Sequence, residues 1–251
     1  MVDDHEDMWP HTSRFTLLWH PDDYAGQKWI RVQATQLEDH QARTRRDKKK
    51  ILEGWIDLLS HGETGVTHLM LDSRVPQDLL AAVQGLTALR WLDVKWGPYD
   101  DLDPLRSLEQ LRLLRLGGAT KIVSLEPLES LESFSQFDLS NAFRLDLTEV
   151  SRLRRLRELW LGTGIGTDRP LKIESLDWLR PLSDLEVLHF VNSHLVEPDL
   201  SVVAGLANLR EFSMPLRRRD RPQVEAIAAT GHPAFVTLAV EFSASWDYGD
   251  V

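Results

Sequence analysis

The feature that most constrains the fold is a short apolar pattern that recurs along most of the chain. The pattern has the form L-x-x-L-x-L, with apolar residues at its three fixed positions. Its first position is held by Val66, Leu89, Leu111, Phe134, Leu156, Leu185, Leu209 and Phe235. Subtracting successive positions gives spacings of 23, 22, 23, 22, 29, 24 and 26 residues. A repeat of this length predicts a solenoid, in which each unit buries its apolar face against the next.

The residues that precede each pattern repeat as regularly as the pattern itself. In the six units from Leu89 to Leu209, an apolar residue stands nine, six and three positions before the first fixed position. These three apolar columns are Leu80, Leu102, Leu125, Leu147, Leu176 and Leu200; Val83, Leu105, Leu128, Val150, Leu179 and Val203; and Leu86, Leu108, Leu131, Leu153, Leu182 and Leu206. A spacing of three predicts a short helix or 3₁₀ turn, and the alternation within L-x-L predicts a short strand.

Together these units resemble the leucine-rich-repeat family over about residues 66 to 242. The segments Pro104-Leu105, Pro127-Leu128 and Pro181-Leu182 are similar to the bacterial internalin type. The resemblance implies an α/β leucine-rich-repeat solenoid. About eight parallel strands would line the concave face, with short helices or 3₁₀ turns on the convex face. The Asn that usually follows each strand is absent here, so other contacts must satisfy the backbone. Its positions hold Gly97, Ala119, Ala142, Gly164 and Ser193.

Both ends of the solenoid need a cap, because each exposes an apolar cross-section. Residues 15–19 and 29–32 predict two strands joined as a hairpin, and residues 36–60 predict an amphipathic helix. We therefore expect a hairpin-plus-helix cap over 13–62, after a disordered tail over 1–12. The solenoid would span 63–242, with a helix at 223–230, a last strand at 235–240 and a polar tail over 243–251.

Charge and composition exclude several classes of function. The chain carries a net charge of −10, so it lacks the basic surface that nucleic-acid binding needs. It contains no cysteine, which removes disulfides, thiolate metal sites and a cysteine nucleophile. Residues 1–7 are acidic and lack the features of a secretory signal, and no apolar run is long enough to span a bilayer. We expect a cytoplasmic monomer with no cofactor and no membrane contact.

Two motifs have a chemical and a plainer interpretation. Residues 162–166 read Gly-Thr-Gly-Ile-Gly and could hold a phosphate, but they lack the G-x-G-x-x-G spacing, so we favour turn glycines. Histidines and carboxylates near the N-terminus lack the spacing of metal ligands, so we expect no metal site. The residues of that second group are His5, Glu6, Asp7, His11, His20, Asp22 and Asp23.

Two basic runs interrupt the acidic sequence. We favour a solvated face for both and keep contact with an acidic partner as the alternative. The runs are Arg152, Arg154, Arg155 and Arg157, and Arg217, Arg218, Arg219 and Arg221. The unit between Leu156 and Leu185 is longer than the others, which predicts an inserted loop near residues 166–173.

The outward strand positions carry the functional prediction. Tryptophan is not needed there for core packing, and Trp and Arg are enriched where proteins bind partners. We predict a partner-binding surface made of Trp91, Asp93, Arg115, Gln136, Asp138, Glu158, Trp160 and His189. The alternative is that the aromatic side chains only cover the sheet or touch the caps.

The resulting hypothesis is a non-enzymatic module that binds a protein partner through its concave face. An inhibitor or immunity protein is one specific version of it. The alternatives are a regulator that activates a partner enzyme, such as a nucleotide hydrolase through Arg115, and a passive scaffold. No Ser stands in a G-x-S-x-G elbow, and too few residues lie outside the repeats for a usual catalytic domain.

Overall fold

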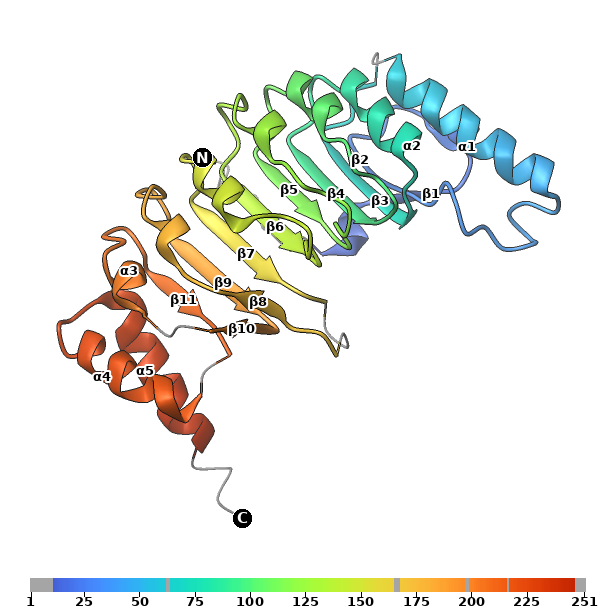
Figure 1. Ribbon diagram of the computed structural model, residues 1–251. Coiled ribbons are helices and arrows are strands. Elements are labelled where there is room, and N and C mark those ends of the chain that lie inside the picture. Colours follow the sequence, from blue (N-terminus) through green and yellow to red (C-terminus); the bar gives the residue numbers. More distant parts are fainter. Residues whose placement is uncertain (1–10, 62–63, 165–167, 197–198, 216, 247–251) are drawn as a thin grey trace.

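A single parallel sheet runs the length of the molecule (Figure 1). The computed structural model describes residues 11–61, 64–164, 168–196, 199–215 and 217–246. Nine strands form the sheet, in the order β1-β2-β3-β4-β5-β6-β7-β9-β11. They are β1 (Thr16–Leu18), β2 (Trp29–Val32), β3 (His68–Arg74), β4 (Trp91–Trp96), β5 (Leu113–Leu116), β6 (Gln136–Ser140), β7 (Glu158–Gly162), β9 (Val187–Val191) and β11 (Glu211–Ser213).

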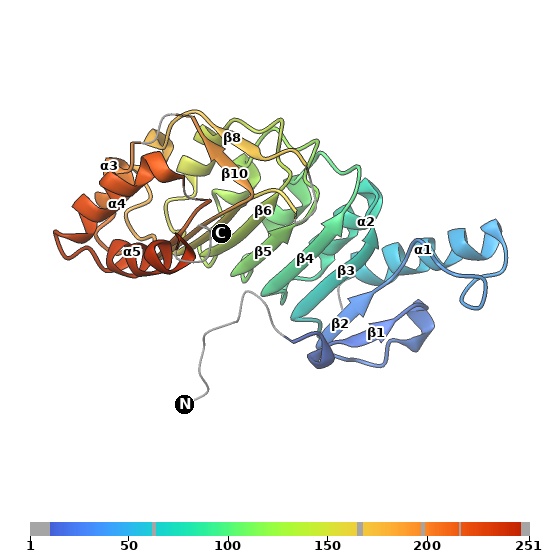
Figure 2. The ribbon, with the colours of Figure 1, turned by 90° about the horizontal axis from the view of Figure 1, so that it is seen from below.

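Helices and 3₁₀ turns return the chain on the other side of the sheet, so the strands line the inner side of an arc (Figures 1 and 2). The helices are α1 (Arg45–Ser60), α2 (Gln77–Ala82), α3 (Ser201–Ala204), α4 (Arg221–Ala228) and α5 (Pro233–Trp246). A 3₁₀ turn at Val83–Gly85 follows α2. In the next four units a 3₁₀ turn stands in place of a helix, at Asp103–Ser107, Glu126–Leu128, Leu147–Arg152 and Asp177–Leu179. Within the described residues, every helix falls short of the length and apolar character needed to cross a bilayer.

The apolar columns form one continuous core between the sheet and the outer turns. All members of the three columns are buried except Leu147, which is half-buried. The inward strand residues complete the core, as Leu92 and Val94 do on β4. The predicted leucine-rich-repeat solenoid is therefore confirmed, and seven of its eight predicted strands are present as β3 to β7, β9 and β11.

The predicted N-terminal hairpin is wrong. Strands β1 and β2 form as expected, but they pair in parallel, with Thr16 opposite Ile30, and they begin the main sheet. The connection crosses to the outer side through a 3₁₀ turn at Pro21–Asp23. There the carbonyl of Trp19 accepts a 2.9 Å hydrogen bond from the indole of Trp55 on α1. The first two strands thus act as repeat units, and α1 packs behind them.

Helix α1 is shorter than the predicted 36–60. Thr44 and Asp47 cap each other's backbone N–H groups, which fixes the start of the helix at Arg45. The face made of Ile51, Trp55 and Leu59 is buried, as the amphipathic pattern predicts.

The predicted last strand at 235–240 is also wrong, because these residues lie inside α5. Phe235 and Leu238 are buried at a spacing that suits a helix as well as L-x-x-L, whereas Val236 and Val240 are exposed. The ring of Phe235 lies 5.4 Å from that of Phe212 on β11, so α5 closes this end of the core. Helix α4 matches the helix predicted at 223–230.

The remaining end predictions fall partly outside the described residues. Residues 1–10 of the predicted N-terminal tail lie outside them, and Thr12 begins a 3₁₀ turn that ends at Arg14. The predicted C-terminal tail begins inside α5, and residues 247–251 lie outside the described part. Residues 166 and 167 of the predicted insertion are also outside it, but Leu171–Ile173 forms β8. That strand pairs in parallel with β10 (Ser193–Leu195) in a separate two-stranded sheet.

Close backbone contacts between neighbouring units take the place of the missing Asn ladder. Ala119 donates a 2.9 Å hydrogen bond to the carbonyl of Ser140, and Asn141 donates one of 2.9 Å to that of Gly162. The units approach so closely that a Cβ on Gly97 would lie 1.9 Å from the carbonyl oxygen of Val75. Glycine follows the strand here because no side chain fits.

Candidate binding face

The strand register brings all eight predicted surface residues onto the concave face, in two rows that cross the strands. The first row contains Trp91, Gln136 and Glu158, and the second contains Asp93, Arg115, Asp138, Trp160 and His189. Members of the second row are direct Cα partners from β4 to β9. The predicted residues therefore lie side by side, although whether they bind a partner stays a prediction.

The first predicted residue, Trp91, is not exposed. Its side chain is wholly buried in a second apolar cluster, together with Phe15, Met70 and Leu113. The ring of Phe15 lies 5.2 Å from that of Trp91, so the N-terminal segment covers this part of the face. The structure therefore agrees with the alternative interpretation of Trp91, in which the aromatic side chain contacts the cap.

Next to this cluster His68 stacks on Trp29, with ring centroids 3.6 Å apart. Burial, with a smaller contribution from the nearby cations Arg90 and Arg14, lowers the pKa of His68 to about 4. The imidazole is therefore neutral at physiological pH, and this end of the face is apolar and aromatic.

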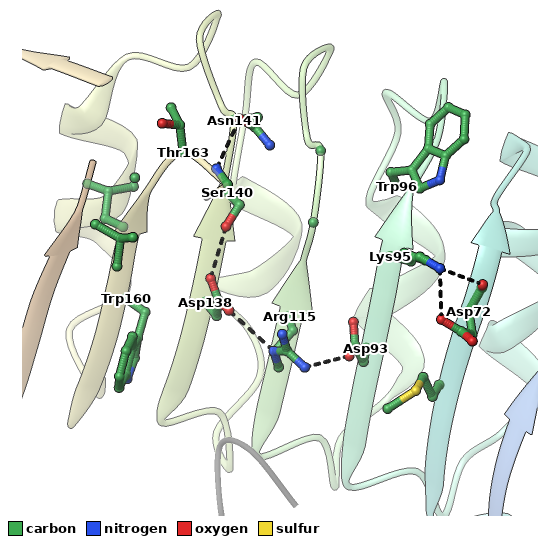
Figure 3. A pocket seen from close by; sticks show the side chains of 17 residues that line it. Asp72, Asp93, Lys95, Trp96, Arg115, Asp138, Ser140, Asn141, Trp160 and Thr163 are labelled. Carbon is green, nitrogen blue, oxygen red and sulfur yellow. Dashed lines mark hydrogen bonds and ion pairs between the residues drawn. The ribbon is translucent and has the colours of Figure 1, made fainter. Parts of the chain in front are cut away.

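The centre of the face is an ion-pair triad across three strands (Figure 3). Arg115 on β5 donates to Asp93 on β4 at 2.6 Å through Nη1, and to Asp138 on β6 at 3.2 Å through Nε. Both carboxylates are buried, with relative exposures of 8% each. One guanidinium thus serves two carboxylates that have little access to water.

This arrangement raises the pKa of both acids. Burial raises the pKa of Asp93 to about 6; Arg115 opposes that rise, and the neighbouring Asp138 adds to it. Burial raises the pKa of Asp138 as well, against the ion pair with Arg115 and the hydroxyl of Ser140. The other charged groups near Asp93 are Asp72 and Lys95. The triad carries an excess negative charge that becomes fully established only above about pH 6.

We expect Asp93→Asn to stabilise the protein at neutral pH but not in mild acid. The folded state holds the Asp93 proton to about pH 6, whereas the unfolded chain releases it near pH 4, so this group costs stability as pH rises between them. The free energy of unfolding of the variant, minus that of the wild type, should grow by about 2 kcal/mol from pH 4.5 to 7.5. Urea denaturation at the two pH values measures it.

Asp199→Asn is the matched control for this effect. Asp199 is exposed, and its pKa is lowered because it accepts hydrogen bonds from Ser201, so its variant should lose stability as pH rises. If the difference in the free energy of unfolding between Asp93→Asn and the wild type stays constant with pH, the raised pKa of Asp93 is contradicted.

Aromatic and acidic side chains occupy the C-terminal half of the face. Trp160 stacks on His189 with ring centroids 3.9 Å apart, and His189 Nε2 lies 2.9 Å from Glu211 Oε1. Burial lowers the pKa of His189, although Glu211 opposes that shift. The amide of Gln136 donates a 2.8 Å hydrogen bond to Glu158.

A pocket of about 530 Å³ opens on the concave face above the triad (Figure 3). It extends from Asp72 and Trp96 to Trp160 and Thr163. The sequence prediction missed Asp72, Lys95 and Trp96 because it considered only two outward positions per strand. A third outward position, two residues further along each strand, would have identified Asp72 and Lys95. Trp96 has no such signal, since it stands at the end of β4.

The structure also places the glycine motif, the candidate metal ligands and the basic runs of the sequence. In the Gly162–Gly166 motif, Gly162 is not a turn residue but the last residue of β7, where a Cβ would lie 1.8 Å from the carbonyl oxygen of Val191. Thr163 and Gly164 follow the strand, and residues 165 and 166 lie outside the described residues. Of the residues considered as metal ligands, His5, Glu6 and Asp7 lie outside the described residues. Within the described part of the chain there is no group of three potential metal ligands. Several arginines of the two basic runs pair with acidic side chains on exposed surfaces. Examples are Arg152 with Glu129, Arg157 with Glu186 and Arg221 with Glu225.

The Arg115 alternative gains no support from this geometry. Its guanidinium is held by two carboxylates, and its side chain is only 18% exposed. An arginine that acts on a partner's nucleotide must extend into the partner's site. Arg115 would first have to leave Asp93 and Asp138 without their counter-charge.

Comparison with solved structures gives the same fold. An internalin (inlF) from Listeria monocytogenes is 20% identical, with a TM-score of 0.51, over 76% of this chain and 51% of that one. The chain thus spans about half the length of that structure. An internalin C2 from the same organism is 21% identical, with a TM-score of 0.41, over 65% of this chain and 75% of that one.

A plant peptide hormone receptor, RGFR1 in complex with RGF2, is 14% identical, with a TM-score of 0.40, over 64% of this chain and 25% of that one. No protein-family model matches the sequence, and no curated protein is similar to it.

Proposed function

Since the chain has the leucine-rich-repeat fold, we propose that it binds a protein partner through the concave face of its sheet. The contact surface extends from β5 to β9, beside the apolar cluster of Phe15, Met70, Trp91 and Leu113, against which Trp160 packs. We call it the β5–β9 patch, and it consists of Arg115, Gln136, Asp138, Glu158, Trp160 and His189.

The observation that carries this proposal is a half-buried tryptophan amid charged groups on a sheet face, beside a pocket of about 530 Å³. Helices α1 to α3 lie on the opposite side of the sheet and do not cover this face (Figures 1 and 2). A tryptophan surrounded by polar groups is the composition of a binding hot spot. Trp91 is excluded from the patch because its side chain is buried.

We expect Trp160→Ala to weaken partner binding at least about tenfold, since it removes the main aromatic contact of the patch. The partner is first captured with the tagged full-length protein and identified by mass spectrometry. Its affinity for wild type and variants is then measured by calorimetry, after circular dichroism confirms the fold of each.

Val123→Ala is the matched control, because Val123 is 55% exposed and lies outside the sheet. This variant should bind the partner with the affinity of the wild type. Because Trp160 also packs on His189, Glu158→Lys serves as a second variant that leaves that stack in place. Unchanged affinity in both patch variants would rule out this face.

An inhibitor or immunity protein is the finer version of this proposal. The net charge of −10 supports it only in part, by favouring encounter with a basic partner. Activity of the captured partner, measured with and without this protein, separates inhibition from activation and from passive scaffolding.

A further inference from the structure

The pocket above the triad has an excess of negative charge. Its lining includes the carboxylates of Asp72, Asp93 and Asp138, against the cations Lys95 and Arg115. Asp72 is well neutralised, since it pairs with Lys95 at 3.1 Å and also with Arg31. The unbalanced charge therefore lies at Asp93 and Asp138, which share one guanidinium.

One carboxylate oxygen in this wall accepts no hydrogen bond from the part of the chain that the structure describes. Asp93 accepts the bond from Arg115 through Oδ2, and its Oδ1 accepts no hydrogen bond from any described residue. Figure 3 shows the carboxylate of Asp93 with this second oxygen turned away from Arg115. Asp93 Oδ1 is not among the buried polar atoms that lack a partner, and Asp93 lines the pocket, so this oxygen is open to a donor that enters the pocket.

The rest of the wall suits a flat cation. Trp96, which lines the pocket, is 41% exposed, and tryptophan is the aromatic side chain that attracts cations best. An arginine or lysine side chain supplies several N–H donors and a positive charge, whereas an acidic group would meet Asp93.

We propose that this pocket receives the cationic end of an arginine or lysine side chain of the protein partner. Asp93 Oδ1 accepts from it, Asp138 adds attraction and Trp96 packs on it. The proposal rests on the proposed function for the source of the cation. The pocket itself can be tested without the partner.

The test titrates the ¹⁵N-labelled full-length protein with N-acetyl-arginine methylamide and follows the indole N–H signals, assigned with Trp→Phe variants. We expect a saturable shift of the Trp96 signal with a Kd on the order of 1–10 mM, as befits one side chain. N-acetyl-norleucine and N-acetyl-glutamate methylamides should give none. Asp93→Asn should weaken binding about tenfold, because it removes a charge-assisted hydrogen bond.

Asp78→Asn is the matched control, since Asp78 is exposed on α2 and its variant should bind as the wild type does. Trp96→Ala is a second variant that should also weaken binding, followed through the indole N–H signal of Trp160, which lines the same pocket. The exposed side chain of Trp96 is not needed for the core. The inference is overturned if the arginine amide causes no saturable shift, if Asp93→Asn binds unchanged, or if the glutamate amide binds more tightly.

The two proposals fail separately. If Trp160→Ala loses partner binding but the wild-type protein does not bind the arginine amide, the proposed function stands and the cation pocket is contradicted. Arginine-amide binding together with unchanged partner affinity in the patch variants supports cation binding and contradicts the proposed function.

Discussion

Arg115→Ala is expected to lower the free energy of unfolding at pH 7.5 by about 3–5 kcal/mol, because it leaves two buried carboxylates without a counter-charge. The loss should shrink in mild acid, since raised pKa values let Asp93 and Asp138 take up protons there. Urea denaturation at pH 7.5 and pH 5 measures both effects.

Arg106→Ala provides the matched comparison. Arg106 also pairs with two carboxylates, Asp103 and Glu126, but all three side chains are at least 39% exposed. Exposed ion pairs contribute little, so this variant should lose at most about 1 kcal/mol. Equal losses in the two variants would show that burial of the triad does not determine its contribution.

Gly162→Ala is expected to cost about 3 kcal/mol or more. The added Cβ would lie 1.8 Å from the carbonyl oxygen of Val191, and that oxygen already accepts a 3.1 Å hydrogen bond from Thr163. The backbone of one unit must therefore move away from the next, which breaks bonds as well as packing. Thermal and urea unfolding give the loss.

The control for this change is Gly65→Ala, where a Cβ meets no atom within 4 Å. We expect its stability to stay within about 0.5 kcal/mol of the wild type. A similarly small loss for Gly162→Ala would mean that neighbouring units can separate easily at this position.

The sequence predicts the repeating part of the fold because its core is local. Each unit buries its own columns, such as Leu102, Leu105 and Leu108, against identical columns one unit away. Period alone therefore locates seven strands and their register. It also locates the triad, since Asp93, Arg115 and Asp138 occupy the same strand position in successive units.

The ends of the solenoid could not be predicted in the same way. Phe235 and Leu238 fit both a strand pattern and a helix, and only packing of Phe235 against Phe212 selects the helix. Strands β1 and β2 are close in sequence, which favours a hairpin, but they pair in parallel, and the segment between them contacts α1 through the hydrogen bond from Trp55 to Trp19.

Exposure of the face was the least predictable property. Trp91 points to the concave side as predicted, yet Phe15, far away in sequence, covers it. The unpaired oxygen of Asp93 depends on how Arg115 divides its donors between two neighbours. Neither property leaves a signal in the repeat pattern.

Alternation along each strand has a consequence for how such a protein can evolve. On β4, Leu92 and Val94 build the interior, while Trp91 and Asp93 face the concave side. Substitutions at face positions from β6 to β9 can therefore change specificity while the scaffold stays intact, and a combinatorial library would best be placed there. Positions under Phe15 are the exception, since a change at Trp91 or Leu113 needs a compensating change in the N-terminal segment.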